Sequence, residues 1–288
     1  MLFPFSTNKI TKNTFTFHTK LIDLLLKNLF RLNDYMKNKY FGVPVCEGAL
    51  EKNDGCENAP SFLFDLFKIN GKLFDLTGEL EDKHGQIYSS AKQIFCNLDL
   101  NEKPVFIGGT HDVTGFIVKA FKEKNKNAKL LIFDAHADCE DALPSTTTHE
   151  DFVRMLVEKN ILNGEDIFIF GLRKVSDIEK ECLAENKINH LYFDEIINDF
   201  EKAKKQVLDF VKDSKNLYVS FDVDMLNSEI LRATGYFPDD GLSCDQTKEL
   251  LELSFPFAKA IDLVEFNPDK ISLGEDKLLK ELFSSFFV

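Results

Sequence analysis

The feature that most constrains the fold is a run of apolar residues that ends abruptly in charged ones. Leu130 to Phe133 are all apolar, and the sequence Asp-Ala-His-Ala-Asp follows them directly. A run this short and this apolar predicts a strand that is buried on both faces of a parallel sheet. In extended chain, Asp134, His136 and Asp138 are spaced two residues apart and therefore point to the same side. We expect this group at the carboxyl end of a strand, where open α/β sheets bind their ligands.

Similar apolar runs alternate with segments of helical periodicity over most of the chain. Strands are predicted at residues 41–45, 104–107, 129–133, 166–171, 190–193, 217–221 and 260–264. Helices are predicted at residues 88–98, 113–122, 150–160, 178–186, 195–212 and 247–253, and another begins near residues 59–60. Residues 72–86 allow either a strand and a loop or a broken helix. The β-α-β order predicts an α/β fold with a central, mainly parallel sheet.

The chain contains no linker and no internal repeat, so we expect a single domain. Its 288 residues are sufficient for one large α/β domain. Apolar residues recur at helical spacing between His18 and Tyr40. Residues 1–40 are therefore predicted to be an N-terminal helical segment that packs on the domain, which as a whole spans residues 1–288.

The charge balance restricts the class of partner. Lys and Arg total 35 against 48 Asp and Glu, which gives a net charge of −13. This excess of negative charge argues against a nucleic-acid surface and against binding to acidic membranes, and it favours a small cationic partner. No segment reaches the roughly 18 apolar residues of a membrane span, and the first 20 residues lack the apolar core of a signal peptide. We therefore expect a cytoplasmic protein.

The six cysteines are scattered without a C-x-x-C pair, which suits reduced thiols better than a disulfide framework. Cys139 directly follows Asp138. It is either a reactive thiol near a metal or, more simply, a small neutral filler, because nothing nearby in the sequence supplies the basic surroundings that activate a thiol.

Two other predicted strands end in residues that can bind metals. The strand at 217–221 runs into Asp222 and Asp224, again two residues apart, and the strand at 104–107 runs into a glycine pair and then His111. A glycine pair allows the backbone to approach closely, so His111 can be held over the carboxyl edge of the sheet. Taken alone, a histidine in the position of His111 is more often a hydrogen-bonded polar residue than a metal ligand. An isolated D-x-H-x-D is a solvated loop as often as it is a metal-binding motif.

Together these strand ends supply six potential ligands, which is the number that a two-metal site needs when carboxylates bridge. They are His111, Asp134, His136, Asp138, Asp222 and Asp224. Carboxylates around imidazoles suit manganese, nickel, iron or zinc.

Two further residues are candidates for the chemistry. His149 ends a polar loop that begins after Asp138, and it is either a group that carries protons near neutral pH or a simple surface residue. Glu265 follows the last predicted strand. A lone Glu there is usually structural, but at the rim of an acidic pocket it can bind a cationic group. The loop at residues 232–243, which contains Thr234, is a candidate wall of that pocket.

The order and spacing of these motifs resemble the ureohydrolases, the arginase/agmatinase family of binuclear manganese hydrolases. The resemblance runs from about Gly42 to Asn267. The motifs that carry it are Gly42-Val43-Pro44 with Gly48 and Ala59-Pro60, Gly108-Gly109-x-His111, Asp134-Ala135-His136-Ala137-Asp138, His149 with Phe152 and Arg154, Gly171-Leu172-Arg173, Ser220-Phe221-Asp222-Val223-Asp224, Thr234-Gly235 with Gly241-Leu242-Ser243, and Glu265-x-Asn267-Pro268.

The resemblance implies an arginase-like fold, which is a three-layer αβα arrangement, and two manganese ions. It also implies that one ion is held by His111, Asp134, Asp138 and Asp222 and the other by Asp134, His136, Asp222 and Asp224. Nickel, iron, cobalt or zinc remain alternatives to manganese. The family is commonly trimeric or hexameric, so a homo-oligomer is implied as well.

The chemistry that the resemblance implies is hydrolysis of a guanidino C–N bond to urea and an amine. A water shared by the two ions attacks as hydroxide, Asp138 accepts a hydrogen bond from it, Glu265 holds the guanidinium, and His149 shuttles a proton to the leaving amine. The substrate contacts that it implies are Glu265, Thr234 and His149.

Departures from the family pattern affect the substrate. Arginases carry acidic residues after Gly-Leu-Arg, where this chain has Lys174 and Ser176, and Glu140 replaces an arginase-type asparagine. L-Arginine is therefore disfavoured, and agmatine, a small cationic guanidino compound, fits an acidic mouth better. Arginase, formimidoylglutamase and guanidinobutyrase activities are alternatives, and so is a catalytically silent member that binds metal.

Overall fold

The computed structural model describes residues 36–236, 238–271 and 276–287. Among these residues, no helix combines the length and the apolar character that crossing a bilayer requires.

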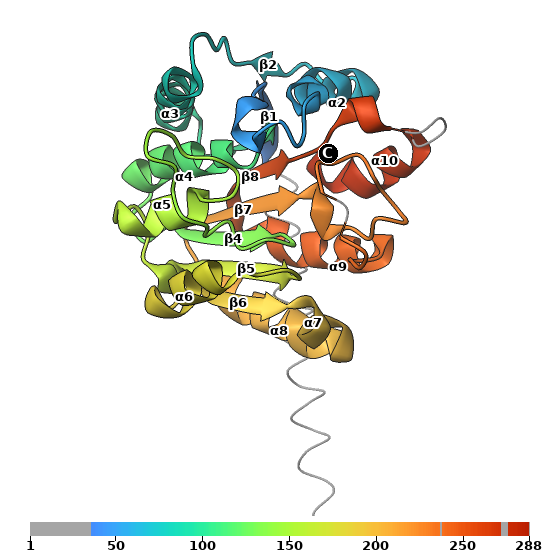
Figure 1. The fold of residues 1–288 in the computed structure, drawn as a ribbon. Helices are drawn as coiled ribbons and strands as arrows, with labels where there is room; N and C mark the ends of the chain where they lie inside the picture. Colours follow the sequence, from blue (N-terminus) through green and yellow to red (C-terminus); the bar gives the residue numbers. More distant parts are fainter. Residues whose placement is uncertain (1–35, 237, 272–275, 288) are drawn as a thin grey trace, which may run out of the picture. The chain divides into compact units, whose positions relative to one another are not determined.

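A single sheet of eight strands forms the middle layer, and every strand pairing in it is parallel (Figure 1). The strand order is β2-β1-β3-β8-β7-β4-β5-β6. The strands are β1 Lys37–Val43, β2 Lys72–Leu73, β3 Glu102–Gly108, β4 Lys129–Phe133, β5 Ile167–Leu172, β6 Asn189–Tyr192, β7 Leu217–Asp222 and β8 Ala258–Val264. This arrangement confirms the predicted parallel sheet.

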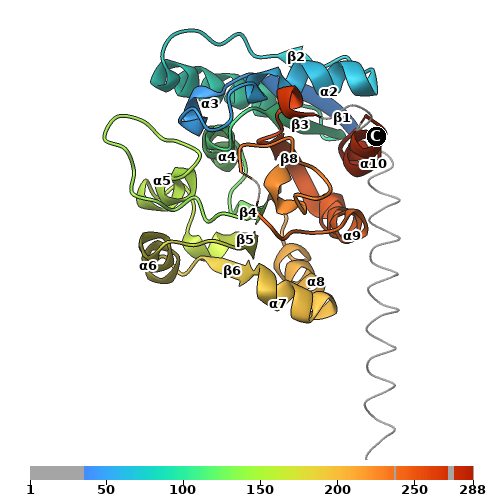
Figure 2. The ribbon, with the colours of Figure 1, turned by 45° about the vertical axis from the view of Figure 1, so that its right-hand side comes forward.

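Helices cover both faces of the sheet, which confirms the three-layer αβα architecture (Figures 1 and 2). One face carries α3 Leu80–Asn97, α4 Asp112–Lys124, α5 Phe152–Glu158 and α6 Asp177–Glu185. The other face carries α2 Ala59–Phe67, α8 Phe200–Val211, α9 Cys244–Ser254 and α10 Asp276–Phe283. A short helix, α7 Phe193–Asn198, follows β6.

The apolar runs form strands because both of their faces are buried. In β4, Leu131 and Phe133 point into the core on the α8 and α9 side, whereas Leu130 and Ile132 point into the core under α4 and α5. This alternation is the two-residue period of a strand, and a strand covered on both sides needs apolar residues at every position.

Two predicted helices differ from the structure. The helix predicted at residues 18–40 is wrong over Lys37–Tyr40, because these residues belong to β1 and pair in parallel with β3 from Lys37–Glu102 onward. Residues 18–35 lie outside the described part of the chain. The single-domain prediction for residues 1–288, with its packed N-terminal segment, includes them and stays a prediction.

The helix predicted at residues 195–212 is two helices, α7 and α8. They separate at Asp199, whose φ of −153° and ψ of 81° are not helical and whose side chain accepts the Lys202 N–H (3.0 Å) to begin α8. In the ambiguous stretch 72–86, β2 is followed by a loop, and α3 begins at Leu80. Helix α10 was not predicted.

The sheet order places the strand ends that bear polar residues side by side. β3, β8, β7 and β4 are consecutive neighbours at the centre of the sheet. Because all of them run in the same direction, their carboxyl ends meet at one edge, which is where parallel α/β sheets bind ligands.

Candidate metal centre

Strand register brings the carboxylates of β4 and β7 together. Phe133 of β4 pairs with Phe221 of β7, so Asp134 and Asp222, the next residues, leave the sheet at the same level. The turn after β3 carries His111 over them. A Cβ on Gly109 in this turn would lie 1.8 Å from the Val45 carbonyl oxygen, so only glycine allows this approach, as predicted from the glycine pair.

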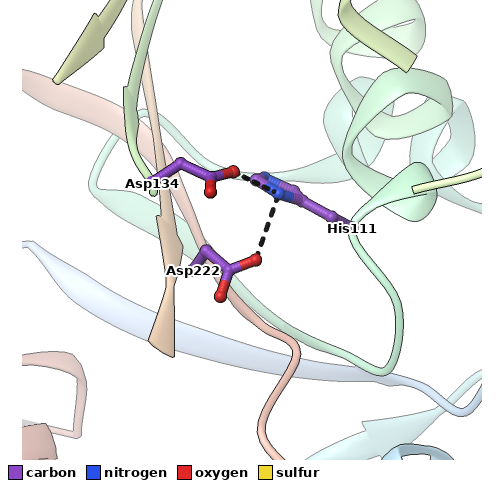
Figure 3. Close-up of side chains that lie close together, drawn as sticks. All are labelled: His111, Asp134 and Asp222. Carbon is purple, nitrogen blue, oxygen red and sulfur yellow. Dashed lines mark ion pairs between the residues drawn. The ribbon is translucent and has the colours of Figure 1, made fainter. Parts of the chain in front are cut away.

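The first group of candidate ligands surrounds the His111 ring (Figure 3). Its Nδ1 lies 2.9 Å from Asp134 Oδ2, 3.1 Å from Asp138 Oδ2 and 3.4 Å from Asp222 Oδ2. All four side chains are buried. Despite these near neighbours, Nδ1 makes no well-aligned hydrogen bond among the described residues. A buried ring nitrogen that faces three carboxylate oxygens without a hydrogen bond to any of them is consistent with a cation site.

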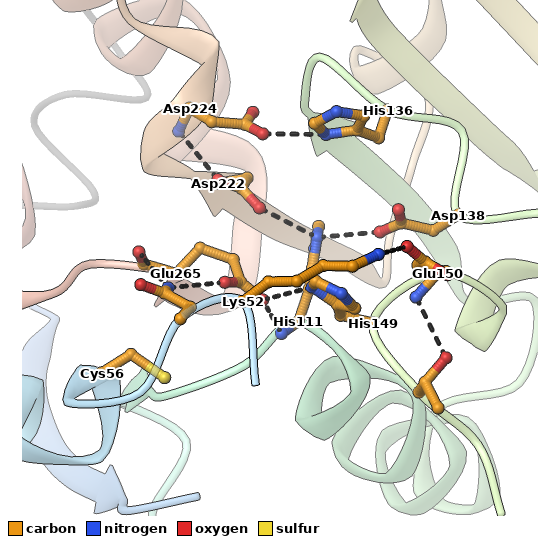
Figure 4. Close-up of polar contacts among 12 residues, drawn as sticks. Lys52, Cys56, His111, His136, Asp138, His149, Glu150, Asp222, Asp224 and Glu265 are labelled. Carbon is orange, nitrogen blue, oxygen red and sulfur yellow. Dashed lines mark hydrogen bonds and ion pairs between the residues drawn. The ribbon is translucent and has the colours of Figure 1, made fainter. Parts of the chain in front are cut away.

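The second group surrounds His136 (Figure 4). Its Nδ1 lies 2.8 Å from Asp224 Oδ2 and 3.6 Å from Asp134 Oδ1. The Asp224 carboxylate is oriented by the Ala135 N–H (3.2 Å), and the Asp224 N–H in turn binds Asp222 Oδ1 (2.8 Å). Asp134 belongs to both groups. The candidate ligand atoms of His111, Asp134 and Asp222 lie within 4.8 Å of one another, and so do those of Asp134, His136 and Asp224.

The charges in this cluster suit cations. Burial and then the charge of Asp134 raise the pKa of the Asp138 carboxyl to about 7. Burial, Asp224 and Asp134 likewise raise the pKa of Asp222. Crowding of carboxylates out of water opposes their ionisation, and a bound divalent cation would reverse this. The residues therefore fit a divalent metal centre, and they comprise all six of the predicted ligands.

Two residues at the site adopt left-handed backbone conformations. Asp138 has a φ of 50° and Glu265 a φ of 62°. Such conformations cost roughly 1–3 kcal/mol in non-glycine residues and cluster at functional sites. The Val153 N–H holds the Asp138 carbonyl (3.1 Å), and the Glu265 N–H donates to the Gly109 carbonyl (2.7 Å), so neighbouring elements fix both side chains toward the centre.

His149 and Glu265 meet beside the candidate metal ligands (Figure 4). His149 Nδ1 lies 3.3 Å from Glu265 Oε1, which also accepts the backbone N–H of His111 (2.7 Å). Burial opposes the charge on His149, but the bond and the charge of Glu265 outweigh it and raise the pKa of the imidazole. His149 is buried, so the alternative of a simple surface residue is wrong.

Asn53 is a residue of the site that the sequence did not reveal. Its Nδ2 donates to Glu265 Oε2 (2.8 Å), and its own Oδ1 accepts from Asn267 Nδ2 (2.9 Å). In the sequence, Asn53 belongs only to an Asn-Asp-Gly segment, which is typical of a loop. Asn267 was part of the motif after β8, and that motif is the one signal pointing to this pair.

A cavity of about 610 Å³ opens onto the centre. Thr234, Glu140, Lys174 and Tyr236 are among the residues that line it. The Tyr236 ring lies 5.0 Å from the His136 ring, centroid to centroid. Thr234 is thus placed at the cavity as expected, although its side chain makes no hydrogen bond within the described part of the chain that would define a role.

At the rim, Lys52 forms an ion pair with Glu150 and lies 5.4 Å above the centroid of the Tyr236 ring. Cys139, by contrast, is buried in the core under α4 and α5, and contact with Cys182 together with burial raises the pKa of its thiol. This favours the neutral filler over a reactive thiol.

Known proteins resemble this chain over most of its length. An agmatinase from Bacillus anthracis is 26% identical over 197 residues, which are 64% of this chain and 64% of that protein. An N(1)-aminopropylagmatine ureohydrolase from Thermus thermophilus is 30% identical over 57% of this chain and 55% of that protein. The chain thus spans less than two thirds of the length of these relatives.

The structure of formimidoylglutamase from Bacillus subtilis superposes with a TM-score of 0.78 at 16% identity, covering 89% of this chain and 90% of that one. This likeness confirms the arginase-like fold. The model of the family described as "Arginase family" matches residues 41–277, close to the stretch over which the sequence motifs resemble the ureohydrolases. The chain therefore belongs to the arginase family.

Proposed function

We propose that this protein is a binuclear manganese hydrolase that cleaves a guanidino C–N bond to give urea and an amine. The observation that carries the proposal is the shared carboxylate: Asp134 lies between the His111 group and the His136 group. A carboxylate that serves two ligand groups at once is typical of a two-metal site.

In this proposal, His111, Asp134, Asp138 and Asp222 hold one metal ion, and Asp134, His136, Asp222 and Asp224 hold the other. When bound, the pair of cations supplies the Lewis acidity that makes a water nucleophilic at neutral pH. Manganese suits the carboxylate-rich donor set, and nickel, iron, cobalt and zinc are the alternatives.

The protein groups around the ligands supply the remaining steps. Asp138, whose carboxylate lies beside the other candidate ligands, accepts a proton from the attacking water. Glu265 pairs with the cationic guanidinium in the cavity. His149, beside Glu265, delivers a proton to the nitrogen of the leaving amine, so that water and a guanidinium yield urea and an alkylammonium.

Agmatine is the first substrate to test. Among the acidic residues of the cavity wall outside the metal cluster, Glu150 is paired with Lys52, and Glu179 accepts the Ser176 N–H (2.9 Å) and the Cys139 N–H (3.4 Å). Glu140 lines the same cavity. Its carboxylate is the one we expect to meet the ammonium tail of agmatine.

A guanidino acid such as 4-guanidinobutyrate is the second candidate. Lys174 lines the same cavity and is exposed, so its ammonium can pair with a carboxylate tail. Arginase and formimidoylglutamase activities are further alternatives, and a catalytically silent member that binds metal is the last.

The test incubates manganese-loaded protein with agmatine, L-arginine, 4-guanidinobutyrate and guanidine and measures urea. N-Formimino-L-glutamate is assayed separately by release of formamide. The Asp222→Asn variant is the matched control, because it removes one shared ligand at almost constant size. Metal-dependent release that this variant abolishes supports the proposal. No release from any compound by protein that binds two manganese ions would favour the silent member.

We also propose, from the family resemblance, a homo-oligomer of three or six chains in the cytoplasm, with a small cationic guanidino substrate and with neither nucleic acid nor membrane as a partner. Light scattering coupled to size-exclusion chromatography measures the number of chains. A monomeric mass would contradict the oligomer.

A further inference from the structure

Behind the metal-facing nitrogen of His111 lies a buried hydrogen-bond chain. His111 Nε2 lies 2.9 Å from Ser220 Oγ, and Ser220 Oγ lies 2.6 Å from Asp262 Oδ1. Ser220 of β7 and Asp262 of β8 are directly paired across the two strands, and neither is exposed to solvent. These hydrogen bonds therefore run from the middle of the sheet to Nε2 of His111. The carboxylate cluster faces Nδ1, the other nitrogen of the ring.

Asp262 accepts hydrogen bonds from three hydroxyl groups. Besides Ser220, the Thr114 hydroxyl donates to Oδ2 (2.7 Å), and so does the Tyr218 hydroxyl (2.8 Å). A hydroxyl has one hydrogen to donate, and each of these three donates it to Asp262. The Ser220 hydrogen is thereby committed, and only the lone pairs of Ser220 Oγ remain for His111.

This arrangement decides the tautomer of His111. Since Ser220 Oγ can only accept from the ring, Nε2 carries a hydrogen, and in the neutral imidazole the lone pair is therefore on Nδ1. Nδ1 is the atom that faces Asp134, Asp138 and Asp222. A histidine that binds a metal through one nitrogen is generally held through the other by such a partner.

We propose that Asp262 is a positioning residue for the metal centre: acting through Ser220, it holds His111 in the tautomer whose Nδ1 can bind a metal ion. The inference rests on the proposed metal centre but not on the identity of the substrate. It concerns one of the two ligand groups, because His136 Nδ1 faces Asp224 and Asp134 and, among the described residues, His136 makes no hydrogen bond to Ser220 or Asp262.

The decisive variant is Asp262→Asn. The Oδ1 position faces one hydroxyl and the Oδ2 position faces two, so the amide NH₂ of asparagine is accommodated best toward Ser220. Ser220 would then accept from the amide and donate its own hydrogen to His111 Nε2. The ring hydrogen would move to Nδ1, the nitrogen that the metal needs.

The experiment measures manganese binding by equilibrium dialysis, and the unfolding midpoint of each metal-free variant in parallel. We expect Asp262→Asn to weaken the site that includes His111 by about 10- to 100-fold, the usual cost of losing such a partner, while the other site keeps its affinity. Ser220→Ala leaves the tautomer of His111 unfixed rather than reversed, so it should weaken manganese binding less than Asp262→Asn does. The double variant Asp262→Asn with Ser220→Ala should recover to the level of Ser220→Ala alone.

Tyr218→Phe is the matched control, since it removes a hydroxyl from Asp262 without touching the bond to Ser220, and its manganese affinity should be unchanged. Two unaffected sites in Asp262→Asn would overturn the inference. So would an equal loss at both sites with a lowered metal-free midpoint, or a double variant that is worse than either single one. If the unaltered protein binds no manganese, the proposed function fails instead, and the two failures are therefore distinguishable.

Discussion

At the scale of single residues, the site depends on neighbours that set the state of each functional side chain. Glu265 shows this most directly, because its two oxygens are divided between different partners. Oε1 faces His149 and the His111 N–H, and Oε2 accepts from Asn53. Asn53 thus orients the carboxylate and satisfies an oxygen that would otherwise be buried without a bond.

Asn53→Ala should weaken substrate binding, because Asn53 orients Glu265. Loss of a hydrogen bond to a charged group costs about 1.5–3 kcal/mol, and Glu265 would then be free to turn away from the cavity. We expect kcat/KM for the best substrate to fall at least tenfold, measured by urea release at constant manganese. Asn163→Ala, at a surface asparagine that bonds to Asp166, is the control. Unchanged kinetics in Asn53→Ala would show that Glu265 does not need this partner.

Lys174 should influence the preference between substrates with different tails. Its ammonium repels the cationic tail of agmatine and attracts a carboxylate, and at an exposed position such effects are about 0.2–1 kcal/mol. Lys174→Glu should therefore raise the ratio of kcat/KM for agmatine over 4-guanidinobutyrate several-fold. Glu140→Gln should lower the same ratio. A ratio that neither variant changes would place the tail elsewhere in the cavity.

At the scale of elements, the local sequence predicted individual strands better than it predicted their order in the sheet. Apolar runs such as residues 130–133 reveal strands because a doubly covered strand leaves no polar position. The insertion of β8 between β3 and β7 is not local information, since these strands are far apart in the chain. The six candidate ligands were predictable because each lies at or shortly after the carboxyl end of a strand. Asn53 and Asp262 were not, because they act through partners more than 40 residues away.

The break between α7 and α8 makes a testable case at this scale. The charged and apolar pattern of residues 195–212 continues through Asp199, but the Asp199 side chain begins a new helix by accepting the Lys202 N–H. Asp199→Ala should lower the free energy of unfolding by about 1 kcal/mol, the usual value of such a cap. Lys202→Ala keeps the donated backbone N–H and should cost less in urea denaturation. An equal loss in both variants would contradict a capping role for Asp199.

At the scale of the whole molecule, the buried carboxylates link metal binding to stability. Removing metal with a chelator should lower the unfolding midpoint, because each site contributes about 2.7 kcal/mol when free manganese is 100 times its Kd. Asp222→Asn should respond much less to the chelator. Without metal, this variant should be at least as stable as the unaltered protein, since burial and neighbouring carboxylates raise the pKa of Asp222 and its charge is unfavourable there. Calorimetry with and without manganese measures both effects.

Another buried charge, near the start of β3, predicts how stability changes in alkali. Lys103 of β3 is 3% exposed, its Nζ donates to the Phe255 carbonyl (3.0 Å), and burial lowers its pKa to about 8. Below pH 8 the lysine is protonated in both the folded and the unfolded chain, and folding must bury the charge. Between pH 8 and about 10.5 only the unfolded chain holds the proton, so the folded state gains stability as the pH rises.

Lys103→Met removes this proton and keeps an unbranched side chain in the same space. The free energy of unfolding of the unaltered protein, relative to Lys103→Met, should therefore increase by about 2 kcal/mol between pH 8 and pH 10, at 1.36 kcal/mol for each pH unit. Urea denaturation of both proteins at several pH values measures the difference, and titrations common to both proteins cancel in it. Parallel curves would mean that Lys103 keeps its proton in the folded state, held by partners strong enough to offset its burial under the sheet.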